Sequence, residues 1–283
     1  MTNPPLIKQG RVFLVGAGPG DVGLLTLRAK ELLSGCDTVV YDALVNPDLL
    51  QFAPYYAERI FVGKRCGKIS WRQDEIHALL AERAGRGERV VRLKGGDPFL
   101  FGRGGEEAVF LASRGIAWEV VPGVSSALAA PAAAAIPVTH RGLASSVAVV
   151  TAHERSEDSA AVNWNALATA VDTLVVMMGA TRLAHVCERI IAGGRAADTP
   201  AAVVQWGTYP HQRVVHAPLS EIAARAQENG FGPPAILVVG AVAALGEQLY
   251  EQLPGLTALV PSGITDSALP GISEPHWLDR SRD

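Results

Sequence analysis

The segment from residue 93 to residue 107 combines five glycines with an acid, two aromatic side chains and an arginine. Glycine has no Cβ, so a glycine-rich turn lets a ligand lie directly against backbone N–H and C=O groups. A plain connecting loop seldom needs so many such positions together with the bulky Phe99 and Phe101. We therefore expect this segment to line a binding site.

A second glycine-rich turn, at residues 16–20, follows the apolar run 12–15. A dinucleotide-binding fingerprint would place its third glycine where this chain has Asp21, and an aspartate at a helix start repels a pyrophosphate. Asp21 is instead a good N-cap for a helix that begins near Gly23. Asp42 stands about 20 residues further on, as a ribose-binding acid would. A dinucleotide-dependent oxidoreductase is therefore the less favoured alternative.

Alternating strands and helices are expected to hold these turns in place. The first half of the chain shows short apolar runs typical of buried strands, separated by segments with helical periodicity. The expected strands are 12–15, 38–41, 60–62, 89–93 and 118–121, and the expected helices are 24–33, 73–84 and 106–114. This alternation predicts parallel pairing and an α/β domain of three layers. Residues 125–136 are nearly all small and predict a helix that can approach its neighbours closely.

The same rhythm restarts after residue 142. The expected strands are now 147–151, 173–178, 201–205 and 235–240, and the expected helices are 183–192 and 219–229. The sequence thus predicts two α/β/α domains with mostly parallel sheets, at residues 10–140 and 145–250. A tail at residues 252–283, rich in Pro, Gly and Ser, is expected to be mostly irregular.

Composition excludes several classes of function. A formal net charge of −3 argues against nonspecific nucleic-acid binding, which needs a basic surface. No stretch approaches the roughly 20 apolar residues of a membrane span, and the N-terminus lacks the apolar run of a signal peptide, so we expect a soluble, cytoplasmic protein. Cys36, Cys66 and Cys187 match no metal-ligand spacing and are interpreted as buried apolar residues. We expect no metal site.

Five motifs in order carry a resemblance to a known family. They are VGAGPGD (15–21), YDALV (41–45), VRLKGGDPFLFGRGGEE (91–107), PGVSS (122–126) and IPVTHR (136–141). With these motifs the chain resembles the uroporphyrinogen-III C-methyltransferases, of the tetrapyrrole/precorrin methyltransferase family, from about residue 10 to residue 244.

The resemblance implies two domains that enclose a cleft and a homodimer. It implies methyl transfer from S-adenosylmethionine to C2 and then C7 of uroporphyrinogen III. The product would be precorrin-2, formed via precorrin-1, for sirohaem, cobalamin or haem d1. A precorrin methyltransferase acting at another ring carbon is the alternative within the family.

By position, the resemblance also implies a set of cofactor contacts. They are Pro19, Gly95, Gly96, Asp97, Ser125, Ser126, Met178, Gly207 and Ala235. Met177 replaces a tyrosine often found at its position, which removes a hydroxyl, and it is expected on the substrate side.

The substrate side needs groups for carboxylates, for pyrrole N–H groups and for a proton. Arg103 matches a position proposed in the family to take part in proton removal. A guanidinium stays protonated, so we expect Arg103 to orient substrate carboxylates while Glu106 or water accepts the proton. The structural alternative is a loop arginine paired with an acid at the helix start.

The remaining substrate contacts are assigned with their structural alternatives. Arg141 is the second residue expected to bind substrate carboxylates. Lys64, Arg65 and Lys94 are weaker candidates, and their structural alternative is a solvated position at the surface. Asp42 is expected to accept from pyrrole N–H groups, or else to cap a turn. Leu44 and Phe101 are expected to wall the cleft, or else to pack in the core. His153 is interpreted as a turn histidine rather than a base.

Overall fold

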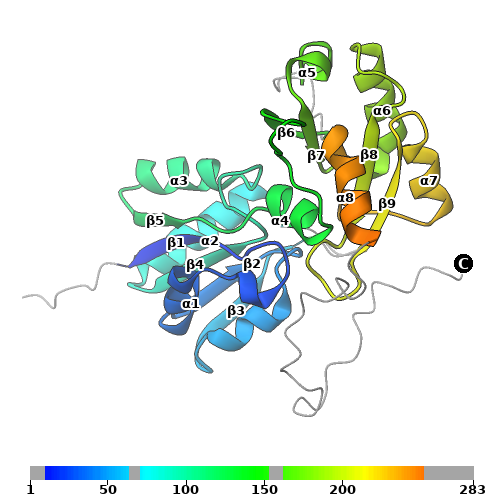
Figure 1. Ribbon diagram of the computed structural model, residues 1–283. Helices are drawn as coiled ribbons and strands as arrows, with labels where there is room; N and C mark the ends of the chain where they lie inside the picture. The colour runs from blue at the N-terminus through cyan, green and yellow to red at the C-terminus, as the bar shows by residue number, and fades with distance from the viewer. Residues whose placement is uncertain (1–9, 64–70, 153–161, 252–283) are drawn as a thin grey trace, which may run out of the picture.

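The computed structural model describes residues 10–63, 71–152 and 162–251, which form two lobes, each built on one sheet (Figure 1). The first sheet contains β1 (Arg11–Gly16), β2 (Thr38–Tyr41), β3 (Glu58–Phe61), β4 (Arg89–Lys94) and β5 (Ala117–Val121). All its pairings are parallel, in the order β3-β2-β4-β1-β5. The alternation of strands and helices predicted the parallel pairing.

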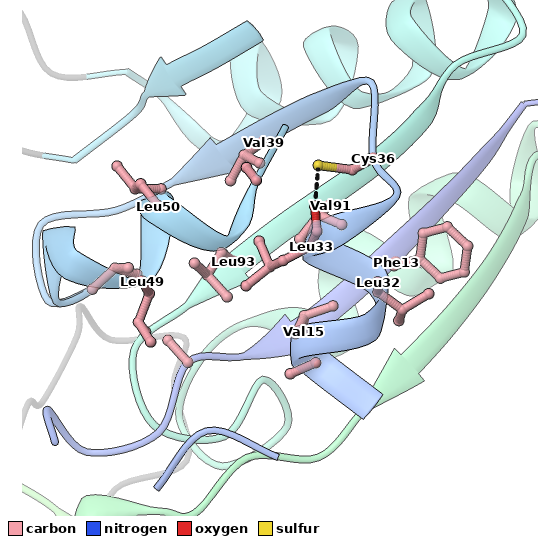
Figure 2. Close-up of a cluster of buried hydrophobic side chains, with 14 of the residues drawn as sticks. Phe13, Val15, Leu32, Leu33, Cys36, Val39, Leu49, Leu50, Val91 and Leu93 are labelled. Atoms are coloured by element: carbon pink, nitrogen blue, oxygen red, sulfur yellow. Dashed lines mark hydrogen bonds between the residues drawn. The ribbon is translucent and has the colours of Figure 1, made fainter. Parts of the chain in front are cut away.

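Helices cover both faces of the first sheet. On one face, α1 (Leu27–Ser34) and the 3₁₀ helix η2 (Pro47–Phe52) pack on the odd-numbered strand residues, as Figure 2 shows around Val15, Val91 and Leu93. On the other face lie α2 (Gln73–Gly85) and α3 (Gly104–Ser113). A 3₁₀ helix, η1 (Val22–Leu24), precedes α1, so the single helix expected at 24–33 is divided in two.

The strand order places a topological switch point between β1 and β4, where the chain connections diverge. The chain leaves β1 through α1 on one face of the sheet, and it leaves β4 through α3 on the other face. The carboxyl ends of two adjacent strands whose connections diverge in this way are where open α/β sheets bind ligands. Both glycine-rich turns of the sequence begin at these two strand ends.

The second sheet differs from the expected parallel pairing. It contains β6 (Val147–Thr151), β7 (Thr173–Met177), β8 (Pro200–Gln205), β9 (Arg213–Pro218) and β10 (Ala235–Val239), in the order β6-β7-β10-β8-β9. Only β6 and β7 pair in parallel, and the other three pairings are antiparallel. Over both sheets, parallel pairings are still the majority. The unpredicted β9 follows β8 after a short loop, and such a hairpin can only be antiparallel.

Helices also cover both faces of the second sheet. One face carries α5 (Trp164–Ala170), α6 (Leu183–Ala192), which follows the 3₁₀ helix η3 (Ala180–Arg182), and α7 (Ile222–Glu228). The other carries α8 (Ala241–Glu251) and α4 (Ser126–Ala133), which lies at the junction of the two lobes (Figure 1). The small residues of α4, Ala127 and Ala130, are fully or almost fully buried there. The predicted close approach of this helix is confirmed.

Two of the three cysteines lie in the cores of the lobes. Cys36 and Cys187 are buried in the two lobes, and burial raises the thiol pKa to about 11 and about 12. Cys66, Lys64, Arg65, His153 and the 252–283 tail lie outside the described residues. Among the described helices, none is both long and apolar enough to cross a membrane.

Candidate active site

Three glycine turns meet, backbone on backbone, at the carboxyl ends of β1, β4 and β5. Gly18 N donates to Gly96 O at 3.2 Å, and Gly96 N donates to Gly18 O at 2.7 Å. A Cβ on Gly123 would lie 2.2 Å from Gly96 O, and one on Gly16 would lie 2.5 Å from Gly123 N. No side chain fits between these turns, so only main-chain atoms meet there. Gly16, Gly18, Gly96 and Gly123 are called the glycine cradle below.

Asp97 fastens this cradle. Its Oδ1 accepts from Phe99 N at 2.8 Å and Leu100 N at 3.2 Å, and its Oδ2 accepts from Gly123 N at 3.0 Å. The carboxylate therefore shapes the turn after β4 and ties it to the turn after β5. The expected cofactor contact of Asp97 stays a prediction beside this structural role.

Ser125 and Ser126 lie next to the cradle, at the start of α4. A Cβ on Gly96 would lie 3.8 Å from Ser126 N and 3.9 Å from Ser125 Cα. Ser125 Oγ accepts from Ala127 N at 3.2 Å and so caps α4. Gly96 is more than 25 positions from Ser125 and Ser126 in the sequence, and the structure brings all three together. The predicted cofactor set includes all three.

The loop between β8 and β9 reaches from the second lobe to the first. A Cβ on Gly20, next to Pro19, would lie 2.1 Å from the Tyr209 ring, and Asp21 N donates to Thr208 Oγ1 at 3.1 Å. Asp21 Oδ1 accepts from Gly23 N at 2.7 Å, so its predicted capping role is confirmed, on η1.

Gly207, in the same loop, is placed against α4. A Cβ there would lie 2.3 Å from Ala130 Cβ, which leaves room only for glycine. Ala235 begins β10 beside this loop, paired with Gln205, and the preceding Pro234 O accepts from Trp206 N at 3.1 Å. Two of the predicted cofactor positions of the second lobe, Gly207 and Ala235, are therefore close to one another at the ends of adjacent strands.

Strained backbone is concentrated in loops that follow strands of both sheets. Five non-glycine residues of the loops after β4, β7 and β8 have positive φ, namely Phe101 (55°), Arg103 (59°), Met178 (56°), Trp206 (51°) and Thr208 (71°). Each such residue costs about 1–3 kcal/mol, and strain of this kind gathers at functional sites. Three of the five, Phe101, Arg103 and Met178, were expected site residues.

Apolar side chains stand exposed beside the cradle. Leu44 and Phe101 are exposed, so core packing does not account for them. A Cβ on Gly95 would lie 2.9 Å from Leu44 Cβ, which places Leu44 at the turn after β4. Met178 is 49% exposed, while Met177 at the end of β7 is half-buried and packs on the face that carries α4. Leu44 and Phe101 therefore supply exposed apolar surface in the loops after β2 and β4.

Arg103 and Glu106 form a two-contact ion pair at the start of α3. Arg103 Nε donates to Glu106 Oε1 at 2.8 Å, and Nη2 donates to Oε2 at 2.6 Å. The pair raises the pKa of Arg103, so the guanidinium stays protonated. This is the arrangement that the structural alternative described. Both residues are partly or fully exposed, and their roles toward substrate stay predictions.

Buried charged residues contact Asp42 or lie near it, and the sequence patterns did not identify them as a group. Arg92 Nη2 lies 3.4 Å from Asp42 Oδ2, and Arg92 and Lys94 both contact Glu107 Oε1. Lys94 is only 3% exposed, so the idea that it binds substrate carboxylates is wrong. The signal available was a pair of cations two residues apart within an apolar strand, which places both on one buried face.

The predicted site residue Arg141 and a surface hollow belong to other segments of the chain. Arg141 is exposed in the turn between His140 and Ala144, which are joined by an isolated bridge. A hollow of about 360 Å³ lies at the opposite end of β8, lined by Asp198, His216 and Arg225 among others. Within the described residues, no group of three or more His, Cys, Asp or Glu side chains could hold a metal ion.

Comparison with known proteins connects this geometry to a family. The family model described as Tetrapyrrole (Corrin/Porphyrin) Methylases matches residues 11–223. The uroporphyrinogen-III C-methyltransferase of Bacillus subtilis (strain 168) is 47% identical over 236 residues, which are 83% of this chain and 49% of that protein. The chain spans about half the length of the first curated relatives it matches.

Other relatives match over nearly their whole length. The S-adenosyl-L-methionine-dependent uroporphyrinogen III methyltransferase of Methanosarcina barkeri (strain Fusaro / DSM 804) is 46% identical over 248 residues, 87% of this chain and 97% of that protein. The structure of uroporphyrin-III C-methyl transferase from Thermus thermophilus, complexed with S-adenyl homocysteine, superposes with a TM-score of 0.72 at 43% identity. That match covers 83% of this chain and 100% of the other.

Proposed function

We propose that this chain, which belongs to the tetrapyrrole (corrin/porphyrin) methylase family, transfers methyl groups from S-adenosylmethionine to C2 and then C7 of uroporphyrinogen III. The product is precorrin-2, formed via precorrin-1, and it supplies sirohaem, cobalamin or haem d1. The observation that carries this proposal is the glycine cradle at the carboxyl ends of β1, β4 and β5, where backbone packs directly on backbone. The names of its relatives support the same activity.

The cradle fits the adenosine and amino-acid parts of S-adenosylmethionine. The backbone C=O of Pro19 and backbone groups of the turn Gly95, Gly96 and Asp97 would bind the cofactor from the first lobe. Ser125, Ser126, Met178, Gly207 and Ala235 bind it from α4 and the second lobe. When bound, S-adenosylmethionine supplies the electrophilic methyl group of a sulfonium. The apolar wall beside the cradle favours loss of that positive charge during transfer.

The substrate lies against the exposed wall next to the cradle. Leu44, Phe101 and Met177 contact the apolar faces of the tetrapyrrole, and Arg103 and Arg141 bind its carboxylates. Asp42 accepts hydrogen bonds from pyrrole N–H groups. These residues would hold a ring carbon within about 3 Å of the methyl group and exclude water, which is catalysis by proximity and orientation.

Transfer of the methyl group leaves the ring system with a proton to lose. Arg103 cannot accept it, because the pair with Glu106 keeps the guanidinium protonated. Glu106 or a water molecule beside it accepts the proton. Arg103 then serves to orient carboxylates and to hold Glu106 at the start of α3.

The two sheets suggest how the chain is divided. We place an N-terminal domain at residues 10–140 and a C-terminal domain at 145–250, with α4 joining them through its contacts with the second sheet. The protein acts as a homodimer in the cytoplasm, with a small tetrapyrrole as its partner and no nucleic acid or membrane.

Two measurements test the proposal. Calorimetric titration with S-adenosylhomocysteine and, separately, with NADH distinguishes the methyltransferase from an oxidoreductase; binding of NADH alone overturns it. Anaerobic incubation with S-adenosylmethionine and uroporphyrinogen III should then give a product that carries two added methyl groups by mass, at C2 and C7 by NMR. Methylation at another ring carbon would favour the other precorrin methyltransferases.

A further inference from the structure

Three charged side chains lie buried together beneath α3. Arg92 and Lys94 project from the same face of β4, and each is 3% exposed. Glu107 projects from the first turn of α3 and is completely buried. Removing charges from water is costly, so a buried group of this kind persists only where its members neutralise and hydrogen-bond one another. Arg92, Lys94 and Glu107 are called the buried charge cluster.

The cluster converges on a single oxygen. Glu107 Oε1 accepts from Arg92 Nε at 3.1 Å, from Lys94 Nζ at 3.0 Å and from Gln73 Nε2 at 3.3 Å. Glu107 Oε2 has no hydrogen-bond partner among the described residues. Glu107 therefore fixes the guanidinium of Arg92 from one side.

The rest of that guanidinium is fixed as well. Arg92 Nη1 donates to Val40 O at 3.4 Å and to Leu93 O at 3.2 Å, at the ends of β2 and β4. Only Nη2 is directed elsewhere, to Asp42 Oδ2 at 3.4 Å. Asp42 follows β2 immediately, and its side chain is partly exposed, so the bridge runs from the buried cluster to the surface of the site.

Asp42 contributes to the charge balance of the buried charge cluster. The buried charge cluster has two cations and one anion, which leaves one surplus positive charge. Burial lowers the pKa of Lys94, and the nearby Arg92 adds to this effect, while Glu107 and Asp42 oppose it. His77, hydrogen-bonded to Gln73, has a pKa lowered by burial and so adds no further cation near neutral pH. Asp42 supplies the missing negative charge.

We infer that Glu107, acting through Arg92, is a positioning residue that holds the Asp42 carboxylate oriented toward the N–H groups of a tetrapyrrole. The inference rests on the proposed function, in which Asp42 accepts those hydrogen bonds. Asp42 opens the turn that contains Leu44, and Leu44 contacts Gly95. A carboxylate fixed there faces the substrate side, and Glu107 itself touches no ligand.

The variant Glu107→Gln tests this with little change in shape. Its amide oxygen can replace Oε1 and its amide nitrogen can replace the unpartnered Oε2, while the negative charge is lost. We expect kcat/KM for uroporphyrinogen III to fall at least tenfold, with a higher KM, while the Kd for S-adenosylhomocysteine stays within about twofold. Asp42→Asn should give a similar loss.

The double variant Glu107→Gln/Asp42→Asn decides whether the two residues act as one. If Glu107 acts through Asp42, the double variant is no worse than Asp42→Asn alone. Losses that multiply, an unchanged kcat/KM in Glu107→Gln, or a matching loss of S-adenosylhomocysteine affinity each overturn the inference. If Glu107→Gln fails to fold, Arg92→Lys serves in the same cycle, because it keeps the charge and loses the bridge.

A matched control lies at the other end of the same strand region. Glu88 precedes β4, lies near Arg83 at 3.7 Å and accepts from Thr38 Oγ1 at 2.5 Å, at the opposite end of β4 from the cradle. Glu88→Gln should lower the melting temperature without changing KM. If the wild-type chain makes no methylated tetrapyrrole, the proposed function fails and the inference fails with it. If wild type is active and the cycle is additive, only the inference fails.

Discussion

Replacing Gly123 with alanine tests whether the glycine turns must touch for the cofactor to bind. The added Cβ would lie 2.2 Å from Gly96 O and 2.7 Å from Gly16 Cα. Both atoms belong to the backbone, so no side-chain rotation relieves the contact, and the turns must move apart. Forcing extra atoms into a packed region costs about 1–3 kcal/mol.

The cost should appear in both stability and binding. We expect Gly123→Ala to lower the free energy of unfolding by about 1–3 kcal/mol, which corresponds to a melting temperature lower by about 2–12 °C. The displaced turn also moves Gly95, Gly96 and Asp97, which the proposed function places against the cofactor. Affinity for S-adenosylhomocysteine should therefore fall at least about tenfold, or about 1.4 kcal/mol. Calorimetric titration and thermal melting followed by circular dichroism measure the two effects.

Gly105 provides the control within the same glycine-rich segment. A Cβ there meets no atom within 4 Å, and the residue lies in the first turn of α3. Alanine favours a helix over glycine by about 0.5–1 kcal/mol, so Gly105→Ala should raise the melting temperature and leave the Kd unchanged. Wild-type affinity and melting temperature in Gly123→Ala would refute the close-packed cradle.

Three further predictions concern the charged residues. Arg103→Ala should lower kcat/KM for uroporphyrinogen III by about 10–100-fold, the worth of a lost charged hydrogen bond, with stability changed by less than about 1 kcal/mol because its ion pair is exposed. A fall in S-adenosylhomocysteine affinity instead would assign Arg103 to the cofactor side. Asp97→Ala leaves three backbone N–H groups without their acceptor, so it should cost about 2–4 kcal/mol and weaken S-adenosylhomocysteine binding; Asp97→Asn, which keeps Oδ1, should cost less. Equal losses in the two variants would contradict this account. Asp172 accepts from the backbone and hydroxyl groups of Ser145 and Ser146, which lowers its pKa to about 2. A depressed folded pKa contributes stability above the unfolded value near 4, and this is lost as the pH falls toward 2. Urea unfolding of wild type and Asp172→Asn should therefore differ at pH 7 and converge below pH 3, and a difference independent of pH would exclude this contribution.

The first sheet could be predicted because each strand carries its own signal. Runs such as Val12–Val15 are fully or almost fully buried on both faces, which produces a continuous apolar stretch in the sequence. Right-handed crossovers through helices then make parallel pairing the expected arrangement. The order of the strands and the position of the switch point needed the structure.

The second sheet was less predictable because its pairing depends on an edge strand. β9 is partly exposed along most of its length, contains His216 and ends at Pro218. Its sequence therefore lacks the apolar run of a buried strand. Without β9, the alternation of the remaining strands and helices looks parallel. α5 is only seven residues long, too short for periodicity to identify.

The predicted site residues had local signals, whereas the supporting residues did not. Several glycines and an aspartate in one turn indicate a backbone-lined site from the sequence alone. Arg92 and Glu107 are 15 positions apart, and their relation follows only from the packing of α3 on β4. Likewise, Tyr209 reaches Gly20 only through the loop that β9 creates.

The strand β4 connects the two halves of the site through its alternating side chains. Its end continues into the turn of Gly95 and Gly96, whose backbone belongs to the cradle. Two positions of its even-numbered face, Arg92 and Lys94, carry the buried charges that reach Asp42. The same strand therefore joins the glycine cradle to the guanidinium that contacts the Asp42 carboxylate. On the proposed function, the segment from residue 93 to residue 107 would thus serve both ligands, the cofactor through the backbone of its glycine turn and the tetrapyrrole through Phe101 and Arg103.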